Sequence, residues 1–462
     1  MPNARKTRKA QAAKRKKRRQ RRIYRTILTL LIIGSAAALC LSITPIRETI
    51  AAFWPFAGLD SADSELSENN ALTDSAYTAP IPSEVQTPTL PEKPGAPEAG
   101  ELLENNYIFQ QLNEEQKAAV RTIKNGMMAC EEEIRFSTPI SLENASAAMQ
   151  VLNDQDVELI HFEGSSGWTF EIDSQGSVAA IQLGYTMTPE ELQANLQALY
   201  AKADELAAQT SGLTPYQKTV FFNDVLVDQT EYDLDAANAH NAYGALIENR
   251  AVCDGYTQAM NLLLARSGIS SISMHGFASA SSAGHSSNDL ADLQPEYDEE
   301  GAVKVPEYMV GHAWNAIRLD DGWYYADVTF DDPNGEDGFG KHRYLNLSFD
   351  DLRHSHVFAP WQPLAPLYPV ENNTTYSWYV QENRQADSEE QAKEIFLQQL
   401  EQKEPSVVIR ITDPQAFQRI SDDRQIIASL WADNASNVGW DHGLVSVDEL
   451  LQVIEFSLPY LE

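Results

Sequence analysis

Apolar and polar residues alternate along this chain in patterns that predict an ordered region of helices and strands beginning near residue 102. Over 106–130 the apolar residues recur every three to four positions, which is typical of an amphipathic helix. Short apolar runs bounded by turn residues then predict three strands, at 157–160, 168–172 and 178–183. Helices and strands of this kind bury one face against each other, so we expect a folded α+β module here.

Two threonines followed by proline mark the starts of the next helices. Thr188 and Thr214 each precede a proline at the first helical position and a Glu or Gln three residues on, which is the pattern of a capping box. Apolar residues after Thr188 continue at helical spacing as far as Leu206. We expect 101–210 to be an accessory α+β module, with these helices docked on the domain that follows.

A cysteine begins a helix in the most informative stretch, which runs from Glu248 to Pro333. Apolar residues follow Cys253 at helical spacing up to a stop at Gly268: Tyr256, Ala259, Met260 and Leu263. A thiol at a helix N-terminus faces unpaired N–H groups and the positive end of the helix dipole, which favours its thiolate form. Cys253 is therefore a candidate nucleophile.

A histidine and an aspartate follow the cysteine in an order that suits nucleophilic catalysis. His312 and Asp327 come after Cys253, so the chain supplies a nucleophile, a base and an orienting carboxylate in turn. A lone cysteine is usually a small buried apolar residue. The three together, with the cysteine at the start of a helix, favour a catalytic site over a structural role.

A predicted hairpin determines whether His312 and Asp327 can meet. Strand-like runs flank Asp320-Asp321-Gly322, so a β-hairpin is expected over 312–330. If Asp320 and Asp321 form a two-residue turn, His312 and Asp327 lie on the same face of the hairpin. A three-residue loop would place them on opposite faces unless a bulge corrected the register. Both loops fit the sequence.

Three blocks of this stretch resemble the core blocks of the transglutaminase-like superfamily, in the same order. They are Ala-Val-Cys253-Asp-Gly-Tyr, His312-Ala-Trp-Asn and Tyr-Ala-Asp327-Val-Thr-Phe-Asp-Asp-Pro, and the resemblance spans about 214–333. It implies an α+β, papain-like core, in which the cysteine helix packs on an antiparallel sheet, with Cys253, His312 and Asp327 as the triad. That family includes protein cross-linkers, deamidases, peptidases, a glycan-releasing amidase and inactive relatives, so the resemblance leaves the reaction open.

The residue types predict acyl transfer through a thioester. His312 would take the proton of Cys253, the thiolate would attack an amide carbonyl, and water or a lysine amine would resolve the thioester. Water would make the protein a peptidase or amidase, and an amine would make it a transglutaminase. Tyr243 is a candidate oxyanion donor or a packing residue, while Trp314 and Asn315 are expected to wall and orient the site. The alternative function is a catalytically silent surface scaffold or binding protein.

We expect no cofactor and no metal ion. His354 and His356 have a metal-like spacing, but no cysteine or carboxylate pair completes a site, so a structural role is favoured. The acidic run at 333–338 does not match a calcium loop, which needs Gly at position six and Glu at position twelve. His275 and His285 lie in no recognisable motif.

Charge is distributed unevenly along the 462 residues and predicts a membrane anchor. Of the 34 Lys and Arg, 13 lie in 1–25, which contains no acidic residue. The 21 residues of 26–46 carry no charge, and that length spans a bilayer core as a helix. By the positive-inside rule, the basic arm 1–25 is cytoplasmic and the rest lies outside. A cleaved signal peptide is the alternative, disfavoured by the long basic region and by the lack of a small-residue cleavage site.

The next segment and the remaining charge define the expected partners. Residues 47–100 are rich in Ser, Thr, Asp, Glu and Pro and predict a disordered stalk. The net charge is −33 despite the basic arm, which disfavours nucleic acid as a partner. We expect a single-pass cell-membrane protein that resembles membrane-anchored bacterial members of the superfamily, with extracytoplasmic domains acting on proteins or peptides at the cell surface.

The remaining segments complete the expected organisation. The catalytic core should occupy 211–360, and 361–462 a small α/β module with a strand at 407–411 and helices at 389–400, 414–430 and 447–454. The segment 278–309 is a surface loop or, alternatively, a flap over the site. Cys40, Cys130 and Cys253 are too few for a disulfide framework, and a bridge between the last two, which would block the chemistry, is disfavoured.

Overall fold

The fold is described by a computed structural model that covers 101–162, 168–279, 296–297, 303–304, 309–332, 340–358, 363–404, 406–422 and 444–457. The basic arm, the expected membrane helix 26–46 and the stalk 47–100 lie outside the described residues. Of the helices within these ranges, none combines the length and apolar character that a membrane crossing needs. The segment 280–308 is described only at β7 (Glu296–Tyr297) and β8 (Val303–Lys304), which pair with each other and belong to a compact unit separate from the remaining elements.

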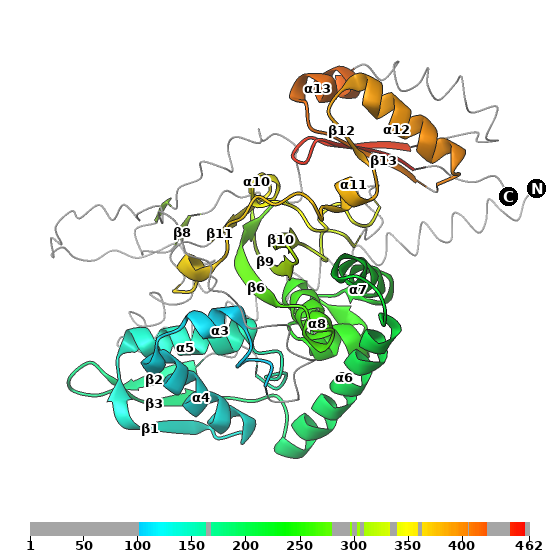
Figure 1. The fold of residues 1–462 in the computed structure, drawn as a ribbon. Helices are drawn as coiled ribbons and strands as arrows, with labels where there is room; N and C mark the ends of the chain where they lie inside the picture. Colours follow the sequence, from blue (N-terminus) through cyan, green and yellow to red (C-terminus); the bar gives the residue numbers. More distant parts are fainter. Residues whose placement is uncertain are drawn as a thin grey trace, which may run out of the picture. The chain divides into compact units, whose positions relative to one another are not determined.

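The centre of the larger unit is a four-stranded antiparallel sheet with the strand order β10-β9-β6-β11 (Figure 1). Its strands are β6 (Ser271–Ala278), β9 (Val310–Leu319), β10 (Gly322–Ala326) and β11 (His356–Phe358). The helix α8 (Cys253–Arg266) packs against β6 and β9. In turn, α8 is contacted by α6 (Pro189–Gln209) and α7 (Pro215–Gln229), so a helical layer covers this part of the sheet. The mixed α+β core expected from the sequence is thus present.

Sequence signals correctly placed the three helices around this sheet. The threonine side chains of Thr188 and Thr214 cap α6 and α7 in capping boxes, each with proline in the first turn. Strand β6 follows α8 in the chain, after the stop at Gly268. Between α7 and α8 lie β4 (Glu231–Tyr232), the π-helical turn η2 (Gly244–Glu248) and β5 (Arg250–Ala251), and β4 pairs in parallel with β5.

The hairpin of β9 and β10 has the two-residue turn that brings His312 and Asp327 together. Leu319 pairs with Gly322 and Asn315 pairs with Ala326, so Asp320 and Asp321 alone form the connection. The second strand is shorter than expected and ends at Ala326, not at residue 330. The chain turns there because the Asp331 amide donates a hydrogen bond to the Asp327 carbonyl at 3.0 Å.

The accessory region differs in part from expectation. It contains α3 (Tyr107–Gln111), α4 (Glu114–Met128), β1 (Glu133–Ile140), α5 (Leu142–Gln155), β2 (Trp168–Ile172) and β3 (Val178–Leu183), and its sheet has the order β1-β3-β2. The helix expected over 106–130 is divided, because Asn113 interrupts it and caps α4 in a capping box. The strand expected at 157–160 is wrong, because these residues form turns after α5. The elements α5 and β1 were not predicted.

The accessory region shares its hydrophobic core with the central sheet. Phe109, Ile123 and Leu152 belong to the same buried cluster as Trp314 and Trp323 of the hairpin. The edge of the Tyr107 ring contacts the Trp323 ring, with centroids 4.9 Å apart. Helix α6, which was assigned to the accessory module and expected to dock on the domain that follows, contributes to the second buried cluster around α8. The two predicted regions are therefore packed as one body.

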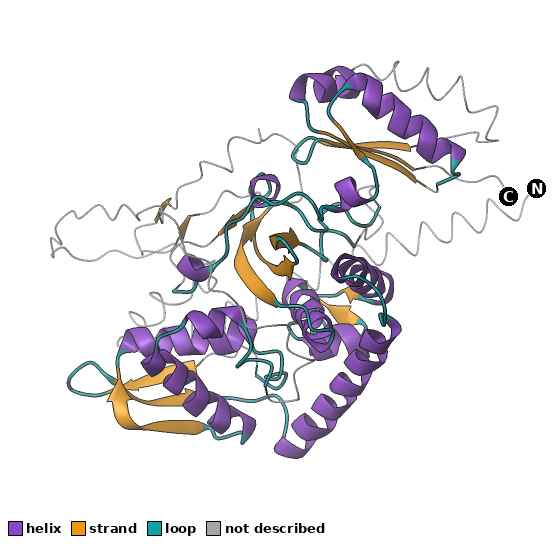
Figure 2. Cartoon of the chain, viewed as in Figure 1, coloured by secondary structure: helices purple, strands orange, loops and turns teal. Residues whose placement is uncertain are grey.

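The C-terminal region consists of one layer of β-strands and one layer of helices. Its sheet has the order β12-β13-β15-β14, and the helices α12 and α13 pack beside it (Figure 2). The elements are β12 (Gln385–Ala386), α12 (Glu389–Glu401), β13 (Ser406–Ile411), α13 (Pro414–Asp422), β14 (Leu444–Asp448) and β15 (Val453–Ser457). Shorter pieces, α10 (Phe349–Leu352), η3 (Ala365–Leu367) and α11 (Trp378–Gln381), connect it to the central sheet. The helix expected at 447–454 is wrong, since two antiparallel strands and their turn occupy these positions.

Gly244 holds the chain leading to the cysteine helix close to its neighbours, and we predict that it tolerates no side chain. A Cβ at this position would collide with the Asn238 carbonyl oxygen and lie 2.8 Å from that of Arg250. Because backbone atoms cannot move aside as side chains do, Gly244→Ala should lower the free energy of unfolding by about 3 kcal/mol, as overpacking does. Denaturant unfolding measures this, with Gly184→Ala as the control, because nothing lies within 4 Å of a Cβ there. Equal midpoints for the two variants would contradict the prediction.

Candidate active site

Cys253 is the first residue of α8 and stands where backbone N–H groups are unpaired. The preceding residue, Val252, occupies the N-cap position and has no side chain that could accept a hydrogen bond from the first turn. By contrast, Thr188 caps α6 with its hydroxyl. The thiol of Cys253 is free and partly exposed, and Cys130 is also free, so the disfavoured disulfide between them is absent. This helix start therefore keeps its electropositive end available to a thiolate or an oxyanion.

His312 joins the cysteine to the carboxylate. Its Nε2 lies 2.6 Å from Oδ2 of Asp327, and Cys253 lies close enough to raise the pKa of the same imidazole. Since Nε2 faces Asp327, the other ring nitrogen, Nδ1, is the one left for the thiol. The structure therefore brings together the three residues that the sequence selected, from α8, β9 and the turn after β10.

Packing and charge fix the state of the His312 ring. It stacks on the Phe330 ring with centroids 4.6 Å apart, and its side chain is only 4% exposed. Burial by itself would lower the pKa of His312, but the charge and hydrogen bond of Asp327, together with the contact to Cys253, raise it to about 10. The imidazole is therefore cationic at neutral pH.

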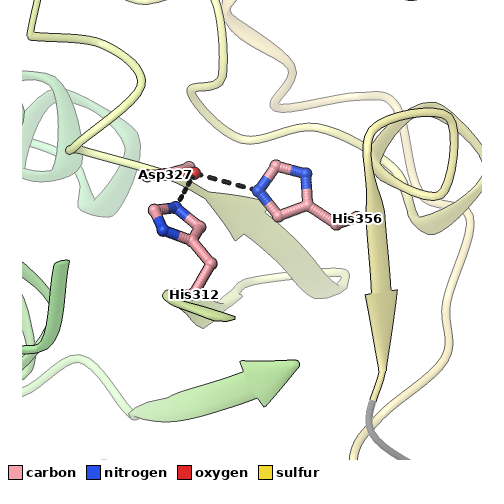
Figure 3. Close-up of side chains that lie close together, drawn as sticks. All are labelled: His312, Asp327 and His356. Carbon is pink, nitrogen blue, oxygen red and sulfur yellow. Dashed lines mark hydrogen bonds and ion pairs between the residues drawn. The ribbon is translucent and has the colours of Figure 1, made fainter. Parts of the chain in front are cut away.

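Asp327 is fully buried and well supplied with hydrogen-bond donors. Besides His312, the Phe330 amide donates to Oδ1 at 3.0 Å, and Nε2 of His356 lies 2.9 Å from Oδ2 (Figure 3). Burial opposes ionisation, yet the charge and hydrogen bond of His312 and the hydrogen bond of His356 keep the pKa of Asp327 well below its ordinary value. The carboxylate is therefore charged and held in one orientation.

The three residues that we expected to contact the substrate all pack against other parts of the protein. Trp314 is fully buried, and its ring lies 6.3 Å from that of His312. Asn315 is also buried, and its amide donates to the Thr257 carbonyl at 3.0 Å and to the Asn261 side chain at 2.9 Å, which joins β9 to α8. Tyr243 packs partly buried beside η2. Contact of any of the three with a substrate stays a prediction.

A chain of alternating charges beside Cys253 was not predicted. Oδ2 of Asp254 lies 2.8 Å from Nδ1 of His240, and Oδ1 lies 3.3 Å from Nε2 of His275. On its other side, His275 lies 3.5 Å from the buried carboxylate of Asp154 in α5. Burial alone would lower the pKa of His275, but Asp154 and Asp254 raise it to about 9. This chain anchors the first turn of α8 to the accessory region.

Two more residues at the site were missed for different reasons. Tyr232 sits opposite Ala251 in the β4–β5 pair, and burial, with the nearby Cys253 and Asp254, raises its pKa to about 12. No sequence motif marks it. His356 lies at the start of β11, where its pairing with Ala278 of β6 brings it toward Asp327. In the sequence, only its metal-like spacing from His354 marks this residue.

Within the described ranges, His312, Asp327 and His356 form a group whose possible metal-ligating atoms all lie within 4.8 Å of one another. Both imidazole nitrogens approach the same carboxylate oxygen at 2.6 and 2.9 Å, which are direct hydrogen-bond distances. A zinc ion bound at about 2.0 Å from each nitrogen would have to break both hydrogen bonds. The arrangement thus fits shared protons better than a metal ion.

A cysteine at a helix start lies near an imidazole that is hydrogen-bonded to a buried carboxylate, and this is the arrangement of a candidate cysteine–histidine–aspartate site. Residues 204–328 match the family described as the Transglutaminase-like superfamily, and this match includes all three residues. The chain therefore carries a domain of the transglutaminase-like superfamily. No curated protein matches the chain.

Solved structures align with part of the chain. A TGase is 15% identical over 43% of this chain, with a TM-score of 0.21. A protein from Cytophaga hutchinsonii, named as a candidate cysteine protease, is 13% identical over 35%, with a TM-score of 0.21. The periplasmic domain of TgpA from Pseudomonas aeruginosa, bound to ethylmercury, is 18% identical over 34%, with a TM-score of 0.20. The alignments cover 50%, 61% and 58% of those chains, respectively, which is less than two thirds of each.

Proposed function

We propose that this protein catalyses thiol-dependent acyl transfer on protein or peptide amides, with Cys253 as nucleophile. The observation that carries the proposal is the double engagement of His312. Its ring is hydrogen-bonded to the buried carboxylate of Asp327, and Cys253 lies close enough to raise the pKa of the same ring. A ring held in this way can carry the proton given up by the thiol without turning and pass it later to a leaving group.

The first half of the reaction uses the charges of this site. The proton of Cys253 resides on His312, which is cationic at neutral pH, and Asp327 stabilises this imidazolium beside the thiolate. The sulfur attacks the amide carbonyl carbon, which forms a C–S bond and places the electron pair of the C=O bond on oxygen. When the tetrahedral species collapses, the C–N bond breaks and His312 gives its proton to the departing amine. A thioester on Cys253 remains.

The backbone at the start of α8 is suited to the oxyanion. The Cys253 amide belongs to the first turn of the helix, whose N-cap residue supplies no side-chain acceptor. An N–H group aimed at the developing oxygen charge stabilises the transition state strongly, since it needs no reorganisation. Tyr232 and Tyr243 are the candidate side chains for a second donor.

The second half of the reaction decides what product forms. Water activated by His312 would release a carboxylic acid, whereas a primary amine would form a new amide, and either step restores the thiol of Cys253. We place this chemistry on the extracytoplasmic side of a membrane. This part of the proposal is supported by the basic arm 1–25 and the uncharged segment 26–46.

The test uses the full-length chain with a pool of glutamine- and lysine-containing peptides and a tagged primary amine. We expect hydrolysed or amine-tagged peptides that are absent with Cys253→Ala, because no other side chain at the site can form the thioester. The ratio of the two products identifies the acceptor. Cys130→Ala is the matched control and should leave product formation unchanged. Equal product with Cys253→Ala and the unaltered chain would overturn the proposal, and no product from either would favour a silent scaffold.

A further inference from the structure

His356 shares one oxygen atom with the imidazole of the proposed catalytic site. Its Nε2 lies 2.9 Å from Oδ2 of Asp327, the same oxygen that accepts from Nε2 of His312 at 2.6 Å. Figure 3 shows the two rings reaching the carboxylate from different elements, β9 and β11. The ring centroids are 5.7 Å apart and the ring planes are tilted by 51°, so the two rings meet at Asp327 and do not stack on each other.

The hydrogen bonding of His356 makes it a neutral donor. Burial lowers its pKa, and this effect, with the smaller one of the nearby His312 cation, outweighs the opposing effect of Asp327. A neutral imidazole has one N–H, and a carboxylate can only accept, so that hydrogen is on Nε2. The opposite nitrogen, Nδ1, lies 2.8 Å from the hydroxyl oxygen of Ser355, which also lies 3.3 Å from the Leu352 carbonyl oxygen. When the hydroxyl directs its single hydrogen to the nearer of these two acceptors, Nδ1, it favours the tautomer that Asp327 requires.

Aromatic side chains prevent the His356 ring from turning away. Trp314 meets it edge to face with centroids 4.8 Å apart, and the rings of Phe330 and Tyr344 lie at 5.2 and 5.6 Å. Its side chain is fully buried. Phe330 and Trp314 also flank the His312 ring, so the same two aromatic residues align both imidazoles.

The position of Asp327 depends on these donors. Oδ1 is held by one backbone amide, from Phe330, and Oδ2 by the two imidazoles. Without His356, Oδ2 would keep only the hydrogen bond from His312 among these donors. His312 moves its own proton during the reaction. A donor that keeps its proton throughout therefore fixes the carboxylate while His312 changes state.

We propose that His356 is a positioning residue, which holds Asp327 toward His312 through the Nε2–H hydrogen bond and so maintains the reactive Cys253–His312 pair. The inference rests on the proposed function. The positioning role requires a hydrogen-bond donor at position 356, and this donor need not be an imidazole.

The test compares His356→Gln with His356→Leu in the full-length chain. The glutamine amide can donate to Asp327, whereas leucine fills similar space without a donor. The readout is the rate at which iodoacetamide alkylates Cys253 at pH 6, resolved by peptide mass spectrometry. Loss of a hydrogen bond to a charged group should slow alkylation about tenfold in His356→Leu, and His356→Gln should restore the rate to within about threefold of the unaltered chain.

The possible outcomes separate this inference from the proposed function. Slow alkylation of Cys253 in the unaltered chain would contradict the proposed function itself. Fast alkylation there together with an unchanged rate in His356→Leu would overturn only the positioning role. Equal slowing in both variants, or slowing accompanied by equal loss of thermal stability in both, would assign the ring a packing role and would also overturn the inference.

Discussion

Replacing Asp327 with asparagine is expected to lower the free energy of unfolding at pH 7 by about 3 to 5 kcal/mol, because a buried charge pair that loses one partner leaves the other uncompensated. Both side chains of the Asp327–His312 pair are almost entirely buried. Denaturant unfolding followed by tryptophan fluorescence measures the effect. The matched control is Asp350→Asn, since the Asp350 side chain is 61% exposed and its removal should change stability by less than about 0.5 kcal/mol.

The same variant should show a characteristic dependence on pH. The pKa of His312 is raised from 6.5 to about 10, so its stabilising contribution is complete below about pH 6.5 and is lost as the pH rises through 10. The pKa of Asp327 is lowered from 3.8, so its contribution is complete above about pH 4 and is lost in stronger acid. The difference between the unaltered chain and Asp327→Asn should be largest between pH 4 and 6.5 and should shrink toward pH 10. A difference that stays constant from pH 5 to 10 would contradict this account.

Replacing His312 with alanine should slow alkylation of Cys253 at pH 6 by about 100-fold, because the thiolate is the reactive form and loses its cationic partner. Time courses with iodoacetamide, resolved for each cysteine-containing peptide, measure the change. The control is His354→Ala, which leaves the hydrogen bonds of His312 and His356 to Asp327 in place and should leave the rate within about twofold. If His312→Ala reacted as fast as the unaltered chain, the imidazole would have no part in activating the thiol.

The parts of the site that follow from local signals could be predicted from the sequence. Cys253 begins a helix because apolar spacing and the stop at Gly268 define α8 on their own. The hairpin about Asp320 and Asp321 could be located in the same way, but the length of its turn, and with it the register that carries His312 toward Asp327, comes from the structure alone. Both features depend only on residues close to one another in the chain.

The parts that depend on distant contacts could not be predicted. His356 reaches Asp327 because β11 pairs with β6, and the sequence does not reveal that pairing. The charge chain through His275 needs Asp154, which lies in a helix of the accessory region. The spacing of residues in the sequence predicts neither contact, so it gives His275 and His356 no role in the site.

Two errors in secondary structure have local causes. The buried run at 157–160 is apolar enough for a strand, but short apolar runs do not distinguish strands from other buried segments. At 447–454 the spacing of Val447, Leu450, Leu451 and Ile454 imitates a helix. There the side chain of Asp448 accepts hydrogen bonds from the amides of Leu450 and Leu451, and this turn separates β14 from β15.

The central claim is that Cys253 is an activated thiol, and the most direct test is its alkylation rate at pH 6 relative to that of Cys130 in the same full-length chain. Burial raises the pKa of Cys130, so this cysteine should react slowly and serves as an internal reference. The account predicts that Cys253 reacts about 100 times faster than Cys130 at this pH. Equal rates for the two cysteines would contradict it.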